Sequence, residues 1–256
     1  MGLSGYIEAV RAQMKRAGDV FREEGLKSFT VKSVQAPALI LRSAMLRKRL
    51  RQLERDDNLE TRLDFVFNSK DLAPFQIRSE LVQMLQIVRE KGPRTVVEIG
   101  TANGGTLYLL CYAAHPKATI ASLDLPAGKF GGGYSAWKIP LYRSFARKIQ
   151  TIHLLLGDSH AESCFKDLVH ALAGKEVDFL FIDADHTYEG VKRDFELYSS
   201  LVAKDGLIGF HDIAPIAPTA DYGVRRFWEE LKPNYKWQEI IADPRQRGFG
   251  IGLIQK

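Results

Sequence analysis

The chain has 256 residues, of which 45% are hydrophobic and 26% are charged. These values are ordinary for a globular protein of one or two domains, and they exclude long disorder and fibrous repeats. The formal charge of +5 is mildly basic, which bears on association rather than on fold. No apolar run approaches the ~20 residues that span a bilayer. No secretory signal pattern is present, so we expect a cytoplasmic protein.

The sequence contains two cysteines, Cys111 and Cys164. They are too few for a disulfide scaffold or a four-thiolate zinc site. Each lies in a mixed apolar stretch, so both are expected to be buried free thiols.

Residues 1–70 are rich in Lys and Arg and contain few strand-like runs. Apolar positions after Pro37 recur near helical spacing, and proline is accepted in a first helical turn, so we predict an amphipathic helix from Pro37 to Arg55. Its basic side chains are Arg42, Arg47, Lys48, Arg49, Arg51 and Arg55, and an acidic group, Glu54, Asp56 and Asp57, lies at its end. Such a face could be solvated, contact a membrane surface, or bind nucleic acid or an acidic partner. We expect the extension 1–70 to cap the main domain or to form a homodimer contact.

From Phe75 onward, short apolar runs alternate with helical patterns. The expected strands lie at 95–99, 118–123, 151–156, 177–182 and 206–210. The expected helices run from Ile77 to the Gly92-Pro93 stop and over 106–114, 142–148, 164–172, 189–201 and 223–231. Such alternation predicts an α/β fold, doubly wound around a mostly parallel sheet, for domain 71–256. Two final strands, 235–241 and 249–254, have no helix between them and should pair as an antiparallel hairpin.

Ligands in such folds bind beyond the carboxyl ends of the strands. The first strand ends in a turn that carries Glu98, Gly100, Thr101, Asn103, Gly104 and Gly105. Glycines allow a tight turn and a close approach to a ligand, and the following helix points its free N–H groups there. The spacing is neither the dinucleotide fingerprint nor a P-loop, which disfavours an NAD-dependent oxidoreductase.

Acidic residues end the next two strands. Asp124 follows the glycine turn by roughly 20 residues, where a carboxylate can accept both ribose hydroxyls. Asp158 and Ser159 end the third strand and suit an adenine amino group. Together these positions predict a nucleoside pocket.

The segments 97–105, Asp124 and 157–159 resemble class I S-adenosylmethionine-dependent methyltransferases, from about Gln76 to the end of the chain. The resemblance implies a seven-stranded, Rossmann-like sheet whose antiparallel last strand lies between strands five and six. It implies that Glu98 and the glycines surround the methionine part and the ribose of S-adenosylmethionine. It also places Asp124 at the ribose hydroxyls and Asp158 and Ser159 near the adenine.

The segments 181–194 and 209–213 look like a bacterial small-molecule methyltransferase group that is labelled cephalosporin hydroxylase-like and includes sugar O-methyltransferases. They are similar, more distantly, to catechol and caffeoyl-CoA O-methyltransferases, which hold Mg²⁺ at the ends of strands four and five. Carried over, Asp183, His211 and Asp212 are the metal ligands, and Asp183 also borders the cofactor. His211 stands where a carboxylate is expected, and imidazole suits Mn²⁺ better than Mg²⁺, so the divalent metal is left open.

The same resemblance gives His186, three residues after Asp183, the role of general base. A neutral imidazole titrates near pH 6.5 and can take a hydroxyl proton at neutral pH. Asp185 is the second candidate. The other histidines, which we expect to be surface or satisfied structural residues, are His115, His153, His160 and His170.

The segment 128–140 forms a long loop after Asp124. It carries three consecutive glycines and the aromatic residues Phe130, Tyr134 and Trp137. Mobility and aromatic surface beside a ligand site favour a substrate lid, and a passive insertion is the alternative.

We therefore expect an enzyme that methylates a hydroxyl of a small molecule, such as a sugar, a phenol or a natural product. A nucleic-acid methyltransferase would explain the basic helix. However, strand four ends in Asp-Ala-Asp-His (183–186), not in the Asn/Asp-Pro-Pro-aromatic tetrad of enzymes that methylate base amino groups. A non-catalytic S-adenosylmethionine-binding module, acting through its N-terminal segment, is the other alternative.

Overall fold

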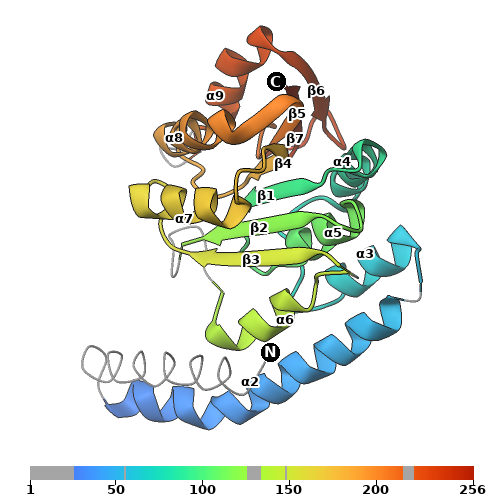
Figure 1. The fold of residues 1–256 in the computed structure, drawn as a ribbon, viewed down its shortest axis with the longest axis vertical. Helices are drawn as coiled ribbons and strands as arrows, with labels where there is room; N and C mark the ends of the chain where they lie inside the picture. Colours follow the sequence, from blue (N-terminus) through green and yellow to red (C-terminus); the bar gives the residue numbers. More distant parts are fainter. Residues whose placement is uncertain (1–25, 55, 126–133, 148, 216–221) are drawn as a thin grey trace.

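The computed structural model describes residues 26–54, 56–125, 134–147, 149–215 and 222–256. In this part of the chain one sheet of seven strands has the order β3-β2-β1-β4-β5-β7-β6 (Figure 1). The strands are β1 (Thr95–Ile99), β2 (Thr119–Asp124), β3 (Thr151–Leu156), β4 (Val177–Ile182), β5 (Val202–His211), β6 (Lys236–Ile240) and β7 (Ile251–Gln255). Strands β1 to β5 pair in parallel, and β7 is antiparallel to both of its neighbours. The predicted α/β sheet and C-terminal hairpin are confirmed.

Helices cover both faces of this sheet (Figure 1). They are α2 (Leu26–Leu53), α3 (Leu59–Phe67), α4 (Arg78–Lys91), α5 (Gly105–Ala113), α6 (Ile139–Arg143), α7 (Glu162–Leu172), α8 (Tyr188–Tyr198) and α9 (Val224–Leu231). One buried cluster joins α3, α4, α5 and α6 to the sheet, and a second joins α7, α8 and α9 to its other face. Coverage of both faces explains why all five residues of β1 are buried instead of only every second one.

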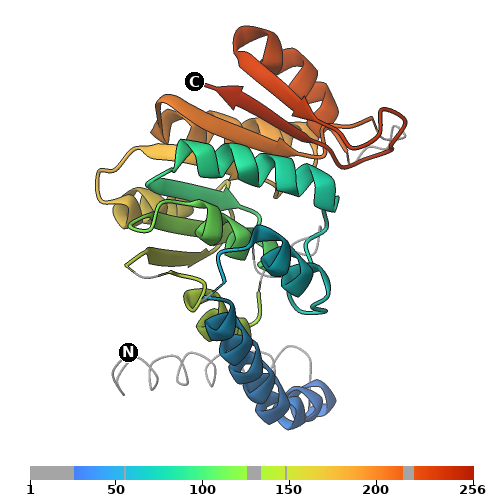
Figure 2. The ribbon, with the colours of Figure 1, turned by 90° about the vertical axis from the view of Figure 1, so that its right-hand side faces the viewer.

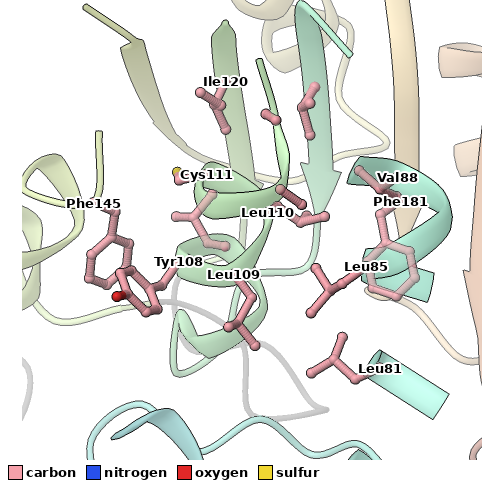
Figure 3. Close-up of a cluster of buried hydrophobic side chains, with 14 of the residues drawn as sticks. Leu81, Leu85, Val88, Tyr108, Leu109, Leu110, Cys111, Ile120, Phe145 and Phe181 are labelled. Carbon is pink, nitrogen blue, oxygen red and sulfur yellow. The ribbon is translucent and has the colours of Figure 1, made fainter. Parts of the chain in front are cut away.

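Helix α5 forms the centre of the first cluster. All of its residues, from Gly105 to Ala113, are buried, because the sheet lies on one side and α3 and α4 lie on the other. Figure 3 shows Leu85 and Val88 of α4 beside Leu110 of α5 and Phe181 of β4. This packing fixes α5, and with it the turn between β1 and α5.

Three predicted elements differ from the structure. Helix α2 begins at Leu26 rather than at Pro37, so Pro37 lies inside the helix and not in its first turn. The helix expected at 142–148 lies instead at Ile139–Arg143, with Pro140 in its first turn. Strand β5 runs from Val202 to His211, so His211 is the last residue of the strand and not the residue after it.

Helix α3 was not predicted as a separate element. Its N-cap, Asn58, accepts a hydrogen bond from the backbone N–H of Glu60 at 2.8 Å. An asparagine just before an apolar helical pattern is a start signal, so the local sequence does contain the information.

Part of the N-terminal extension belongs to the main core. Leu46 and Leu50 of α2 and Leu63 and Val66 of α3 lie in the same buried cluster as α4 and α5. Figure 2 shows α2 projecting from the body of the molecule beyond α6. Residues 1–25 and Arg55 lie outside the described residues. Within the described part of the chain, no helix combines the length and the hydropathy that crossing a membrane requires.

Candidate functional site

A cavity of about 740 Å³ lies at the carboxyl ends of the five parallel strands, β1 to β5. Cavities of this size hold small molecules or cofactors. The predicted cofactor residues that line it are Gly100, Thr101, Asn103, Gly104, Gly105, Asp124, Asp158, Ser159 and Asp183. The structure therefore brings together residues from four strand ends, as the strand-end argument predicted.

The turn between β1 and α5 is held against its neighbours. A Cβ on Gly100 would collide with the backbone carbonyl of Asp183, and one on Gly104 would collide with the ring of Tyr142. Both glycines also have positive φ, 89° and 84°. The fold itself therefore requires glycine here, in addition to any need of a ligand. The backbone N–H of Ala102 donates to Asp124 Oδ2 at 2.9 Å, which fixes the turn beside that carboxylate.

Glu98 differs from the other predicted cofactor residues because it does not line the cavity. Its side chain is completely buried. Successive residues of a strand point to opposite faces of the sheet, and both faces of β1 are covered by helices. Val97 and Ile99 join one buried cluster, and Glu98 faces the other side. Burial raises the pKa of Glu98 well above its ordinary range, and the charges of Asp183 and Asp124 add to the rise. The predicted contact between Glu98 and the cofactor is therefore not supported.

Two histidines and two aspartates meet at the other end of the cavity. His211 Nδ1 lies 3.0 Å from Asp183 Oδ1. His186 lies between the two carboxylates, with Nε2 at 3.5 Å from Asp183 Oδ1 and Nδ1 at 3.5 Å from Asp212 Oδ2. The four side chains form one connected group of two imidazoles and two carboxylates. His186 also stacks on Tyr222, with ring centroids 5.8 Å apart.

The pKa values of this group shift together. Burial alone would raise the pKa of Asp183, but the adjacent His211 and His186 hold it well below its usual range. Burial alone would lower the pKa of His211, but Asp183 outweighs it and raises the value to about 9. The pKa of His186 is also raised, because Asp183 and Asp212 offset the effect of burial.

The arrangement does not suit the predicted metal ion. His211 Nδ1 and Asp183 Oδ1 are directed at each other, and Asp212 Oδ1 accepts a hydrogen bond from the backbone N–H of Phe249 at 2.9 Å. Ligand atoms would instead have to point at one common centre. Among the described residues, no three His, Cys, Asp or Glu side chains are grouped so that they could hold an ion. A metal bound by Asp183, His211 and Asp212 stays a prediction, and no step below depends on it.

Asp185, the second candidate base, faces the wall of the cavity. Its Oδ1 accepts a hydrogen bond from the backbone N–H of Thr187 at 2.9 Å. Its carboxyl group also packs against Gly190, where a Cβ would collide with it. These contacts fit a side chain that shapes the start of α8 better than they fit a base.

The sequence argument missed Gln76, which is buried and lines the cavity. Its Nε2 donates to Asp183 Oδ2 at 3.1 Å and to Thr106 Oγ1 at 3.3 Å. Gln76 and Asp183 are 107 positions apart, so no local pattern could reveal the contact. Gln76 fixes the second oxygen of Asp183 and leaves the first for the two histidines.

The predicted lid is only partly within the described residues. Positions 126–133, including Phe130, lie outside them. Tyr134 is buried edge-to-face on Tyr142, with ring centroids 4.8 Å apart. Neither Tyr134 nor Trp137 lines the cavity, and Tyr134 packs in the core, so the described part of the segment does not support a substrate lid.

Lys138, beside these aromatic residues, is buried as well. Its Nζ donates to the carbonyl of Asp71 at 2.8 Å and to Asn103 Oδ1 at 3.2 Å. Burial lowers the pKa of Lys138 to about 8. The residue fixes Asn103, and through it the turn between β1 and α5.

His160 was predicted to be a surface or satisfied structural residue, and the structure places it in the wall of the cavity as well. Its Nε2 lies 3.4 Å from Oδ1 of Asp194, a fully buried residue of α8. The neighbouring Ser159 accepts a hydrogen bond on its carbonyl from Tyr198 of the same helix, at 2.6 Å. Helix α8 thus holds the segment 158–160 in place. Asp194 raises the pKa of His160 above its ordinary 6.5.

This pair predicts a pH-dependent contribution to stability. A histidine whose pKa is raised by folding stabilises the fold below its unfolded pKa, and the contribution disappears as pH rises through the folded value. Asp194→Asn should therefore lower the thermal unfolding midpoint more at pH 6 than at pH 8.5. Because the contribution of protonated His160 is lost as pH rises through its folded pKa, less of it remains at pH 8.5 for the substitution to remove. Asp167→Asn, on the exposed side of α7, is the control. Equal losses at both pH values would contradict the pairing.

Comparison with known proteins shows which proteins this chain resembles. Residues 97–213 match a family model described as a methyltransferase domain. The chain is 31% identical over 188 residues to an uncharacterized protein of Acanthamoeba polyphaga mimivirus. The aligned residues make up 70% of this chain and 81% of that protein.

Solved structures with the same fold include an O-methyltransferase from Bacillus cereus in complex with SAH. It has a TM-score of 0.52 and 17% identity over 80% of this chain and 91% of that one. The O-methyltransferase TomG from Streptomyces achromogenes, which is involved in tomaymycin synthesis and was solved with SAM, has a TM-score of 0.52. It is 18% identical over 76% of this chain and 86% of that one. At these identities the likeness concerns the fold, and it includes the seven-stranded sheet.

Proposed function

We propose that this chain, in which residues 97–213 match a methyltransferase domain, binds S-adenosylmethionine and a small molecule in its cavity and methylates a hydroxyl group of that molecule. The observation that carries the proposal is the division of one cavity into two ends. One end carries the turn between β1 and α5 with Asp124, Asp158 and Ser159. The other end carries an imidazole between two carboxylates.

The first end suits a cationic nucleoside. S-adenosylmethionine supplies a methyl group on a positively charged sulfur. The cavity is lined by several aspartates, among them Asp124, Asp158 and Asp183, although the chain as a whole has a net charge of +5. Negative charge in a partly enclosed cleft attracts a cation. Asp124 comes from the end of β2, where a carboxylate accepts ribose hydroxyls, and its link to the backbone of Ala102 sets its orientation.

The second end suits proton removal. An acceptor hydroxyl that attacks the methyl carbon forms an O–C bond while the S–C bond breaks, and its proton must leave. His186 in its neutral form takes that proton, and the resulting imidazolium lies within 3.5 Å of Asp183 and Asp212. Positioned carboxylates stabilise this charge without moving. The protein otherwise contributes alignment of donor and acceptor.

The cytoplasmic location and the homodimer contact through residues 1–70 stay predictions. Peripheral contact with a membrane through α2 also stays one. On α2, Ile40, Leu41 and Met45 are more than half exposed, which is consistent with a contact surface.

Titration calorimetry with S-adenosylhomocysteine tests the donor site. Wild-type protein should bind it, and Asp124→Ala should weaken binding by about 10- to 100-fold, because hydrogen bonds to a charged group contribute about 1.5–3 kcal/mol. Asp167→Ala, at an exposed aspartate of α7, should leave affinity unchanged. Absence of binding to wild-type protein would contradict the proposed function, and unchanged affinity in Asp124→Ala would exclude the ribose contact.

A further inference from the structure

Phe249 lies at the acceptor end of the cavity, in the connection between β6 and β7. It lines the cavity, and 38% of its surface is exposed. Its ring centroid lies 6.0 Å from that of His211. The ring of Phe249 therefore borders the cavity next to His211.

The backbone of Phe249 is strained. Its φ is +60°, and its neighbours Gly248 and Gly250 have φ of +74° and +81°. Glycine adopts this left-handed region readily, but a bulky side chain does so rarely and at an energetic cost. Three consecutive residues thus have positive φ, and the middle one, Phe249, is not a glycine but carries an aromatic ring. Strain of this kind gathers at functional sites, where it is part of how a group is positioned.

The surrounding chain holds this strained backbone from two sides. The N–H of Phe249 donates to Asp212 Oδ1 at 2.9 Å, and its carbonyl accepts from the N–H of Ala214 at 2.8 Å. On the other side Glu80, which is fully buried, accepts from the N–H of Gly250 at 2.9 Å.

Glu80 holds more of the same connection. Its Oε1 accepts from the N–H of Ala242 at 2.9 Å and from Gln246 Nε2 at 2.7 Å. One buried carboxylate thus fixes the segment 242–250 at three points. The backbone that carries the ring of Phe249 is therefore held beside His211 and Asp212 by contacts within the fold.

We propose that Phe249 is a specificity-determining residue, whose ring forms one wall of the acceptor site and selects acceptors that present a flat, apolar face. The inference rests on the proposed methyl transfer. Two further aromatic side chains line the cavity with large exposed surfaces, Phe75 at 73% and Tyr222 at 40%. Aromatic rings bind flat apolar groups by offset stacking or edge contact. A phenolic hydroxyl meets this requirement, and an open polyol does not.

The test uses variants that separate the ring from the backbone. Phe249→Gly and Phe249→Asn remove the ring and suit positive φ, so neither should lower the thermal unfolding midpoint. Phe249→Tyr keeps the ring. The acceptor probes are catechol and 3,4-dihydroxybenzoate, with myo-inositol and glucose as polyols, and methyl transfer is followed with S-adenosylmethionine.

Wild-type protein should methylate the phenols and not the polyols. The Gly and Asn variants should raise the KM for the phenols by about 10- to 100-fold, with a smaller change in kcat and an unchanged Kd for S-adenosylhomocysteine. The Tyr variant should restore the wild-type KM.

Three results would overturn the inference while the donor site stands. These are methylation of the polyols instead of the phenols, no turnover of any probe by protein that binds S-adenosylhomocysteine, and an unchanged KM in the Gly variant. A large fall in the unfolding midpoint of both the Gly and the Asn variants would show a structural role instead. Failure of wild-type protein to bind S-adenosylhomocysteine would reject the proposed function itself.

Discussion

Replacing His186 with alanine is expected to lower kcat by about 10²- to 10⁴-fold, the range that a positioned general base contributes. Because His186 lies between Asp183 and Asp212, its loss removes both the proton acceptor and the group that links the two carboxylates. The donor end of the cavity keeps its contacts, so the Kd for S-adenosylhomocysteine should stay close to that of wild-type protein. Steady-state kinetics with a methylated acceptor and calorimetry on the same preparation measure the two quantities separately.

A surface histidine serves as the matched control. His170 lies exposed on α7 and does not line the cavity, so His170→Ala should change neither kcat nor Kd. Unchanged turnover in His186→Ala would remove His186 as the base. Loss of turnover together with loss of cofactor binding would mean that His186 holds the donor instead, and the assignment of the two ends would have to be revised.

Arg62→Ala is expected to cause the largest loss of stability. This arginine of α3 is 1% exposed, and its guanidinium donates to the carbonyls of Leu53 and Asp56 at 2.8 and 2.7 Å and to the hydroxyl of Tyr108 at 2.6 Å. It also lies 4.4 Å from the ring centroid of Tyr112. Truncation would leave three oxygens without this donor and a cavity beside α5, so we expect a loss of about 3–5 kcal/mol in the free energy of unfolding.

Urea denaturation measures this loss directly. Arg51→Ala, at an exposed arginine of α2, should change the free energy of unfolding by no more than about 0.5 kcal/mol. If Arg62→Ala also lowered the free energy of unfolding by only about 0.5 kcal/mol, this would contradict the view that α2 and α3 pack firmly against the main core. The same result would favour an extension that folds and moves independently.

The sheet could be predicted because its signals are local. The apolar runs at β1 and β4 and the turn residues after each strand follow from burial on both faces, and neighbouring elements alternate regularly. The start of β5 was harder to predict from the sequence. Asp205, inside this strand, has a φ of +67°, and the pairing of β5 with β4 shifts register between Val177 and Phe179. An irregularity of this kind leaves no periodic mark in the sequence.

The residues of the candidate site that could be predicted from the sequence are those that directly follow a strand. Asp124, Asp158 and Asp183 follow directly from the positions where parallel strands stop. The contact of Glu98 with the cofactor, which the family resemblance implied, stays a prediction, and the structure places this side chain in the interior and not in the cavity wall. Phe249 looked like the first residue of a strand because its aromatic character favours strands, and only the contact with Asp212, 37 positions away, shows its actual place.

The position of β7 has a consequence for how the molecule is made. This strand comes after β6 in the chain but lies between β5 and β6 in the sheet. Until residues 251–255 have emerged from the ribosome, β5 has an unpaired edge and β6 has no strand beside it, and open edges of this kind attract other chains. We expect the segment with Phe249 to reach its place when β7 pairs with β5. The acceptor wall should therefore be the last part of the cavity to form during synthesis, after the donor end between β1 and β2 is complete.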